Sequence, residues 1–282
     1  MKYDIFIPVR LSSERLPKKA LKKIDEKPII KYLIERLQNI KKIDDVIICT
    51  TSQRSDDELI TFLEKEKISY YRGNEKDILQ RFLDSAKKFG SDFIIAIDGD
   101  DIYCDSEIVK KIIETFERTH ADYIKVEGVP VGFTPLGFKI SMLEKICKSK
   151  KTTNTETGYG QFFDIQKDVN TQKDVNTQKD VNTQKDVNTQ KDVNTQKDVN
   201  TQKVIISPKI DFPKNLRMSL DYEEDFLLAQ KIFKKLGNQF HVDDILKFLS
   251  ENPTILDELN ELQKKWENHW NENLADISVR DN

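Results

Sequence analysis

The sequence has few cysteines, no excess of positive charge and no long apolar run, and each shortage excludes a class of protein. The three cysteines, Cys49, Cys104 and Cys147, lie far apart and have no CxxC spacing. This usage predicts reduced thiols, not disulfides or a zinc site, and favours the cytoplasm as the location of the protein. Histidine is equally scarce: His120, His241 and His269 have no partner at ligand spacing, so they are interpreted as structural or surface residues.

Charge and hydropathy exclude two further classes. The 46 Lys and Arg residues are outnumbered by 49 Asp and Glu residues, which leaves a net charge of -3, so the chain has no general basic field for binding nucleic acid. No window approaches the roughly 18 consecutive apolar residues of a membrane helix, and residues 1–9 contain no signal-peptide core. We therefore expect neither a nucleic-acid nor a membrane partner.

The first 130 residues alternate between two hydrophobic patterns. Short β-branched or aromatic runs predict strands at 3–9, 45–51, 68–73, 92–99 and 121–128. Amphipathic segments predict helices at 28–39, 56–67, 76–89 and 106–119. Strands and helices in alternation predict an α/β protein with a mostly parallel sheet and helices on both of its faces. Ligands bind such sheets at the carboxyl ends of the strands, so the loops after Val9, Gly73 and Ile97 are candidate binding loops.

The order is looser beyond residue 130. A Gly/Pro-rich stretch with a possible strand precedes a short helix and a polar loop, at 128–140, 141–148 and 148–160. Near the C-terminus the pattern predicts a strand at 215–220, a turn at Asp221, and a helix at 223–236 that Gly237 closes. Two further amphipathic helices are predicted at 243–252 and 254–277.

Residues 166–201 are six identical copies of QKDVNT, followed by a partial copy at 202–203. Each copy contains one valine, so the tract forms no apolar stripe on a helix and no apolar face on a strand. Its Lys and Asp residues balance, which is typical of a solvated, disordered insertion within a surface connection. The alternative is a spacer or adhesive array.

Two aspartates at predicted strand ends could take part in chemistry. Asp100 follows the apolar strand of IAIDGDD, and Asp221 follows LRMSL more than a hundred residues later. Two converging carboxylates would suit Mg²⁺ bound to a nucleotide. Alternatively, each aspartate is only a turn former or a helix cap.

The loop VRLSSERLPKKAL, residues 9–21, carries several cations after the first strand. Its hydroxyl and cationic groups suit a triphosphate, although a solvated basic loop is the simpler interpretation. The interleaved apolar residues Leu11, Leu16, Pro17 and Leu21 should give the loop a defined shape.

This loop resembles the nucleotide-binding signature of the cytidylyltransferases that make CMP-activated sugar acids, A-R-x-G-S-x-R-L-P-G-K. The segments YYRGNEKDILQRF and NLRMSLDYEEDF resemble the spore-coat polysaccharide biosynthesis branch, and IDGDDIYCDSEI resembles the Q-G-D-x-P-L segment of the Kdo-activating branch. The similarity spans residues 3–165 and 204–237 in the order of the family. It implies a Rossmann-like nucleotide-diphospho-sugar transferase fold with a helical C-terminal tail.

The resemblance also implies roles for individual residues. The triphosphate of CTP would be held by Arg10, Ser12, Ser13, Arg15 and Lys19, with Arg72 and Arg81 near the nucleotide. Mg²⁺ would be ligated by Asp100 and Asp221. In catalysis, Arg15 and Lys19 would stabilise the leaving pyrophosphate, and Asp221 would orient or deprotonate the attacking hydroxyl. Ser12 and Lys18 stand where the family pattern has glycine, and serine is tolerable only if its φ is negative.

The implied activity is transfer of CMP from CTP to a sugar, an acidic ketosugar by the resemblance, for surface polysaccharide or glycan biosynthesis. Candidate sugar-binding residues follow position 128, namely Gly132, Glu156, Tyr159 and Gln161. The resemblance further implies a homodimer, with a nucleotidyltransferase domain formed by 1–165 and 204–240, the repeat insertion at 166–203, and a helical extension at 241–282.

Two alternatives remain open at this point. Asp98-Gly99-Asp100 has the spelling of the D-x-D motif of metal-dependent glycosyltransferases. A catalytically idle nucleotide-binding or scaffold protein is the other alternative.

Overall fold

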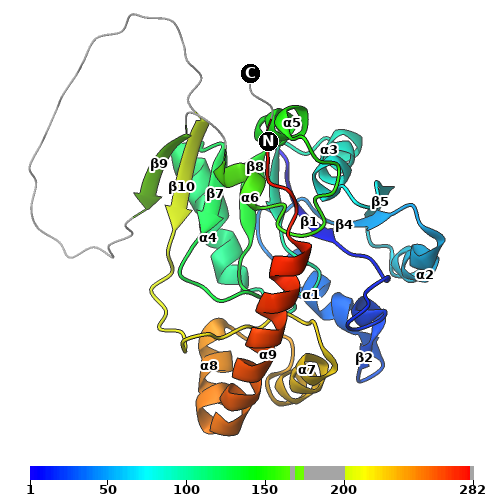
Figure 1. The fold of residues 1–282 in the computed structure, drawn as a ribbon, viewed down its shortest axis with the longest axis vertical. Helices are drawn as coiled ribbons and strands as arrows, with labels where there is room; N and C mark the ends of the chain where they lie inside the picture. Colours follow the sequence, from blue (N-terminus) through cyan, green and yellow to red (C-terminus); the bar gives the residue numbers. More distant parts are fainter. Residues whose placement is uncertain (166–168, 175–200, 280–282) are drawn as a thin grey trace, which may run out of the picture.

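An eight-stranded sheet forms the centre of the protein (Figure 1), seen in a computed structural model that describes residues 1–165, 169–174 and 201–279. The strand order is β5-β4-β1-β6-β8-β7-β10-β9, and every neighbouring pair is parallel except those of β8, which runs antiparallel to β6 and β7. The strands are β1 (Tyr3–Pro8), β4 (Asp45–Thr51), β5 (Tyr70–Gly73), β6 (Phe93–Ala96), β7 (Tyr123–Val126), β8 (Leu136–Lys139), β9 (Val169–Asp174) and β10 (Thr201–Ile206). A small hairpin, β2 (Lys23–Ile24) and β3 (Lys27–Pro28), stands apart from this sheet.

Helices cover both faces of the sheet, as the alternating pattern predicts. Within β1, Ile5 and Ile7 belong to one buried cluster, whereas Phe6 belongs to another on the opposite face. The first cluster receives α1 (Ile29–Gln38), α2 (Asp57–Glu66) and α4 (Ser106–Thr119), and the second receives α3 (Ile78–Phe89), α5 (Ile140–Ser149) and α6 (Gln161–Asp164). The predicted α/β fold class is therefore confirmed.

The predicted C-terminal helices also form and join the first cluster. They are α7 (Glu223–Leu236), α8 (Val242–Glu251) and α9 (Pro253–Asn273), and Figure 1 shows them grouped at one end of the sheet. After α9 the chain returns to the 150–157 segment, where the Ala275 amide donates to the Thr157 carbonyl at 3.1 Å. The helical extension is thus packed onto the main domain at both of its ends.

The strand predicted at 215–220 is wrong. Only an isolated bridge joins Arg217 to Val131, and the Leu220 amide bonds to the Asp100 carbonyl of another loop at 2.9 Å. An extended segment whose backbone groups bond to different partners in turn cannot form a ladder, although its alternating sequence resembles a strand. This segment instead brings Asp221 to the edge of the sheet.

The prediction that the whole repeat is irregular is also corrected where the structure describes it. Residues 169–174 form β9, and β10 begins at Thr201, the last residue of the sixth copy, so the sheet resumes before residue 204. The two strands pair in parallel through backbone hydrogen bonds, which need no apolar face at a sheet edge. The rest of the tract, 175–200, lies outside the described residues. Asp164 contacts Lys203 at 2.5 Å, so the chain leaves and re-enters the domain at one place, as expected for an insertion in a surface connection.

All three cysteines are free thiols, in agreement with the prediction. Among the residues that the structure describes, no helix combines the length and the apolar character that crossing a membrane requires.

Candidate active site

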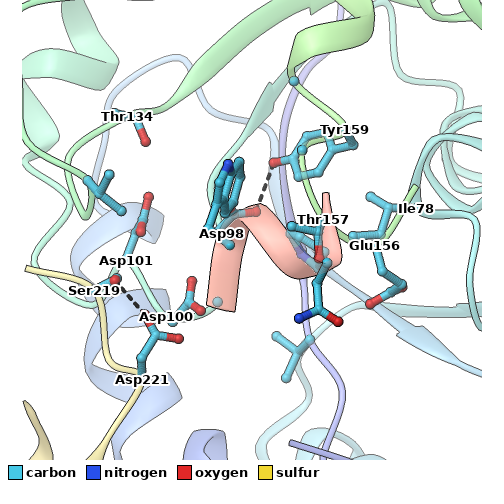
Figure 2. A pocket seen from close by; sticks show the side chains of 18 of the residues that line it. Ile78, Asp98, Asp100, Asp101, Thr134, Glu156, Thr157, Tyr159, Ser219 and Asp221 are labelled. Atoms are coloured by element: carbon cyan, nitrogen blue, oxygen red, sulfur yellow. Dashed lines mark hydrogen bonds between the residues drawn. The ribbon is translucent and has the colours of Figure 1, made fainter. Parts of the chain in front are cut away.

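A cavity of about 790 Å³ opens at the carboxyl ends of the parallel strands. The loop after β1, the loop after β6, residues 156–161, Asp221 and the C-terminal half of α9 all contribute to its walls. Eleven of the thirteen sequence-predicted site residues line it: Arg10, Ser12, Ser13, Arg15, Lys19, Arg81, Asp100, Glu156, Tyr159, Gln161 and Asp221. Figure 2 shows Asp100, Asp101, Ser219 and Asp221 on one side of the cavity and Glu156, Thr157 and Tyr159 on the other.

The basic loop after β1 has a defined shape, as its interleaved apolar residues predict. Leu11 and Leu16 are buried in the core. The Leu11 amide donates to the Asp56 carboxylate at 2.8 Å, and Asp56 is itself fully buried at the start of α2. The loop is therefore tied to the domain, and its Arg10, Arg15 and Lys19 line the cavity.

The two positions at which the family pattern has glycine differ in backbone conformation. Ser12 is not among the residues with positive φ, so the condition for tolerating serine there is met. Lys18 has φ 54 and ψ 29, in the left-handed region that favours glycine. The left-handed backbone conformation at position 18 of this chain thus explains why the family pattern has glycine there.

Lys19 joins Asp100 and Asp221. Its Nζ lies 2.6 Å from Asp100 Oδ2 and 3.4 Å from Asp221 Oδ1, and it also donates to the Leu220 carbonyl at 2.9 Å. Arg15 Nη2 donates to the same Asp221 oxygen at 2.7 Å. The tertiary structure therefore converts four residues separated by up to 206 positions into one charged cluster.

Asp221 is further held by two residues that the sequence reasoning missed as site residues. Ser219 Oγ donates to Asp221 Oδ2 at 2.7 Å, and Arg217 Nη1 lies 3.2 Å from the same oxygen. Arg217 is fully buried and also pairs with Asp225 at 2.6 Å. The signal was present in the NLRMSLDYEEDF motif, in which Arg217 and Ser219 precede Asp221 on alternate positions.

The ionisation of the cluster follows from burial and pairing. Burial opposes the charge of Lys19, but Asp100 and Asp221 outweigh it and raise the pKa of the ammonium group. Burial likewise opposes the charge of Asp221, but Lys19 and Arg15 outweigh it and lower the pKa of that carboxyl. Both groups are consequently charged at neutral pH.

Two neighbouring aspartates behave differently and were not predicted as ligands. Burial, reinforced by the Asp100 carboxylate, raises the pKa of Asp98 to about 7, and Asp98 accepts a hydrogen bond from Tyr159 Oη at 2.9 Å. Burial and the nearby Asp98 raise the pKa of Asp101 well above its usual range. The side of the cavity at the end of β6 therefore has more carboxyl groups than cations, which favours binding a further cation.

On the opposite side of the cavity, Glu156 pairs with two arginines. Its Oε2 lies 3.3 Å from Arg10 Nε, and its Oε1 accepts from the buried Arg81 at 3.1 Å. Arg81, which was predicted to lie near the nucleotide, thus lines the cavity beside Glu156, a candidate sugar-binding residue.

Arg72 and Gly132 are not among the residues that line the cavity. Arg72 on β5 donates to the carbonyls of Thr51 and Gln53 and pairs with Asp57 at 2.8 Å, so its guanidinium stabilises the loop after β4. Gly132 has φ +105, and a Cβ there would lie 2.6 Å from the backbone of Met218. Its role is a close backbone approach, which explains the glycine without a bound sugar.

The C-terminal helix supplies a wall that the sequence did not predict. Trp266, His269, Trp270 and Asn273 of α9 line the cavity. The interpretation of His269 as a structural or surface residue therefore needs correction. An amphipathic pattern showed that α9 has an apolar stripe, but not that half of this stripe faces a cavity.

The donor set at Asp100 and Asp221 fits a divalent cation that also binds phosphate. The two carboxylates already share one cation, the Lys19 ammonium. Within the described part of the chain, no group of three or more His, Cys, Asp or Glu side chains is placed to hold a metal. A site with only the Asp100 and Asp221 carboxylates as protein ligands would leave coordination positions for phosphate oxygens and water, as Mg²⁺ prefers.

Comparison with known proteins agrees with this site. The profile of the cytidylyltransferase family matches residues 5–243. That is most of the chain, and the chain therefore belongs to the cytidylyltransferase family. The resemblance recognised in the loop after β1 is confirmed at the level of the family.

Several characterised and uncharacterised proteins are similar to parts of the chain. An uncharacterized protein of Methanocaldococcus jannaschii is 32% identical over 151 residues, which cover 54% of this chain and 62% of the relative. Spore coat polysaccharide biosynthesis protein SpsF of Bacillus subtilis is 27% identical over 45% of this chain and 54% of its own length. An 8-amino-3,8-dideoxy-manno-octulosonate cytidylyltransferase of Shewanella piezotolerans is 27% identical over 53% and 58%. The chain thus spans little more than half the length of these relatives.

A solved structure shares the fold over nearly the whole chain. A cytidylyltransferase from Leptospira borgpetersenii serovar Hardjo-bovis superposes with a TM-score of 0.70 at 22% identity, over 90% of this chain and 96% of that one. The implied Rossmann-like fold of nucleotidyltransferases is therefore confirmed.

Proposed function

We propose that the protein transfers CMP from CTP to a hydroxyl group of an acidic sugar and releases pyrophosphate. The observation that carries this proposal is the charged cluster in which Arg15 and Lys19 of the β1 loop converge on Asp100 and Asp221. Cations from a fixed loop and two carboxylates at one end of a cavity are what a triphosphate and its metal ion require.

Arg15 and Lys19 are the groups that would stabilise the leaving pyrophosphate. Arg15 uses Nη2 for Asp221, whereas its Nη1 is buried without a hydrogen-bond partner among the described residues. A buried donor without a partner is costly, and a phosphate oxygen would satisfy it. Arg10, Ser12 and Ser13 of the same loop also line the cavity and would complete the contacts with the triphosphate.

Asp100 and Asp221 would hold Mg²⁺ together with phosphate oxygens. When bound, the ion would supply electrostatic stabilisation of the charge that develops on the β and γ phosphates. Arg217 and Ser219 fix Asp221 Oδ2, and this leaves its Oδ1 turned toward Lys19 and Arg15. In that position Asp221 could also orient the attacking hydroxyl.

The substrate class is suggested by the relatives. One relative named above is an 8-amino-3,8-dideoxy-manno-octulosonate cytidylyltransferase, and another relative, from Christiangramia forsetii, is named 3-deoxy-manno-octulosonate cytidylyltransferase. Both octulosonates are acidic ketosugars, and SpsF is named for spore coat polysaccharide biosynthesis. We extend this class to the present chain and place the sugar near Glu156, Tyr159 and Gln161, on the side of the cavity opposite the charged cluster. A homodimer is part of the same proposal, and the solution mass measured against 33.0 kDa for one chain tests it.

Pyrophosphate release tests the reaction. Purified protein is incubated with CTP, Mg²⁺ and each of the two octulosonates, and release of pyrophosphate that depends on both CTP and sugar is expected. Consumption of UDP-sugars in place of CTP would indicate the glycosyltransferase alternative, and CTP binding without turnover would indicate the scaffold alternative. Asp221→Asn is the matched inactive variant.

A further inference from the structure

The apolar stripe of α9 contacts two different parts of the protein, the main core and the cavity. Ile255, Leu259 and Leu262 are buried in the main core. The next residues of the same stripe, Trp266 and Trp270, follow at intervals of four and line the cavity. Residues four apart lie on the same face of a helix. One continuous stripe therefore packs the helix onto the domain with its first half and faces the cavity with its second.

The two tryptophans form a fixed surface. Their ring centroids are 5.1 Å apart with an interplanar angle of 25°. Both side chains are half-buried, so part of each indole remains open to the cavity. The helix is anchored by its core residues at one end and by the hydrogen bond from Ala275 to Thr157 at the other. The wall is thus part of the folded domain, and no hinge motion is needed to form it.

The aromatic surface lies beside the segment that contains the candidate sugar-binding residues. A Cβ built at Gly158 would lie 3.8 Å from Trp270 Cζ2 and 3.7 Å from Gln161 Nε2. In Figure 2 the ribbon of α9 passes beside Asp98, Tyr159 and Thr157. His269 and Asn273 add polar groups on the same helix face. An aromatic plane next to amide and imidazole groups suits a sugar, whose C–H face stacks on the ring while its hydroxyls form hydrogen bonds.

We propose that Trp266 and Trp270 bind the acceptor sugar and determine which sugar is accepted. This inference rests on the function proposed above. Arg15 and Lys19 of the loop after β1 bond to Asp221 and Asp100, whereas Trp270 lies beside Gly158 in the segment of the candidate sugar-binding residues. The indoles are therefore placed for the acceptor. The family profile ends at residue 243, so α9 (Pro253–Asn273) lies outside the residues that the profile matches. A wall contributed from outside the shared region suits the acceptor better than the nucleotide, which the members of the family have in common.

Steady-state kinetics of Trp270→Ala and Trp270→Phe test the proposal, with the octulosonate that gives the faster pyrophosphate release as the sugar. We expect Trp270→Ala to raise KM for the sugar about tenfold and to leave KM for CTP unchanged, because a stacked ring contributes on the order of one tenfold step in affinity. Trp270→Phe should restore most of the affinity. Asn268→Ala, an exposed position on the same helix that does not line the cavity, is the control and should match the wild type. A rise in KM for CTP alone, or no change in either KM, would overturn the proposal.

Fluorescence gives a second readout that does not require turnover. The chain has two tryptophans, and both are in this wall. Titration of the wild type with the octulosonates should change the emission, and the absence of any change at millimolar sugar would contradict the proposal even if Trp270→Ala fails to fold. If the proposed reaction is wrong but the sugar still binds at the tryptophans, the wild type will release no pyrophosphate and its emission will still respond to sugar.

Discussion

Lys18 and Lys19 are neighbours in the chain but have opposite surroundings. Lys18 is exposed, pairs with Glu58 across the surface and has a left-handed backbone conformation. Lys19 is held between two aspartates at the cavity. At the residue scale, Lys18 therefore affects the stability of the loop after β1 through its backbone conformation, whereas Lys19 affects the cavity through its charge.

The backbone role of Lys18 predicts how substitutions there behave. Lys18→Gly should keep the free energy of unfolding within about 0.5 kcal/mol of the wild type, because relief of the left-handed strain offsets the greater entropy of the unfolded chain. Lys18→Val should lower it by about 1–2 kcal/mol, because a β-branched side chain is strained at positive φ. Urea unfolding of the three proteins measures both effects. Equal losses in the two variants would contradict this account.

The charge of Lys19 predicts a large effect on catalysis. Lys19→Met should lower kcat/KM by about 10²–10³, the range observed when one electrostatic donor to a developing negative charge is removed. Lys23→Met is the control, because Lys23 is exposed, pairs with Glu26 alone among the described residues, and does not line the cavity. Pyrophosphate release at saturating Mg²⁺ is the measurement, and wild-type kinetics in Lys19→Met would exclude its role at the leaving group.

Thiol reactivity is a further prediction at this scale. Burial raises the pKa of Cys49 and of Cys147 to about 12 and that of Cys104 well above its usual range. At pH 8 only about one in 10⁴ of the Cys49 and Cys147 thiols is then ionised, and the thiolate is the reactive form. Iodoacetamide should modify the native protein far more slowly than the urea-unfolded protein, as measured by mass spectrometry. Rapid labelling of the native state would contradict the buried positions of Cys49 and Cys104 and the half-buried position of Cys147.

At the scale of elements, the sheet depends on the repeat only at its edge. β9 pairs with β10 alone, whereas β10 pairs with β7 and is held by the Gln202 amide, which donates to Asp122 at 3.0 Å. Thr201, from the last copy, is buried and accepts a hydrogen bond from Lys145 at 3.0 Å. Thr201 of the last copy is thus part of the domain, and residues 169–174 of the first two copies add an edge strand that β8, β7 and β10 separate from β6.

Deletion of residues 166–195 tests this division. The variant retains the last copy, and the short distance between Asp164 and Lys203 allows the shortened connection to close. We expect unchanged kinetics of pyrophosphate release, because residues 169–174, the part of the deleted segment that the structure describes, do not line the cavity. A longer deletion that also removes 196–203 should lower the melting temperature, because it removes the first half of β10. Loss of activity or of the oligomer in the shorter deletion would show that the repeat has a functional role.

At the scale of the whole molecule, ligand binding should stabilise the fold with a preference for one nucleotide. The cavity is formed by segments from residue 8 to residue 273, so a bound nucleotide links most of the chain. CTP with Mg²⁺ at 100 times its Kd should add about 2.7 kcal/mol of stability, equivalent to a rise of about 5–10 °C in melting temperature. UTP, ATP and GTP serve as controls in the same thermal-shift experiment. An equal shift with UTP would contradict the assignment of CTP.

The sequence by itself determined the class of fold and predicted eleven of the residues that line the cavity. Alternating hydrophobic periods predicted all five parallel strands of the first 130 residues and the helices between them, because burial on one or two faces imposes those periods. The basic loop and Asp100 were predicted because parallel strands place their carboxyl ends at one edge. Asp221 was predicted on the same ground, although the strand expected before it does not form. Glu156, Tyr159 and Gln161 were also correctly placed at the cavity.

Only the tertiary structure decided which distant groups meet. Arg217 and Ser219 hold Asp221, Asp98 receives the hydroxyl of Tyr159, and the tryptophans of α9 close one wall. Arg72 bonds to a neighbouring loop, and Gly132 is explained by a close backbone contact. A local pattern reports which side of an element is buried, but not what lies opposite it. That depends on the packing of segments up to 206 residues apart, and this packing decides whether an apolar side chain faces the core or a cavity for substrate.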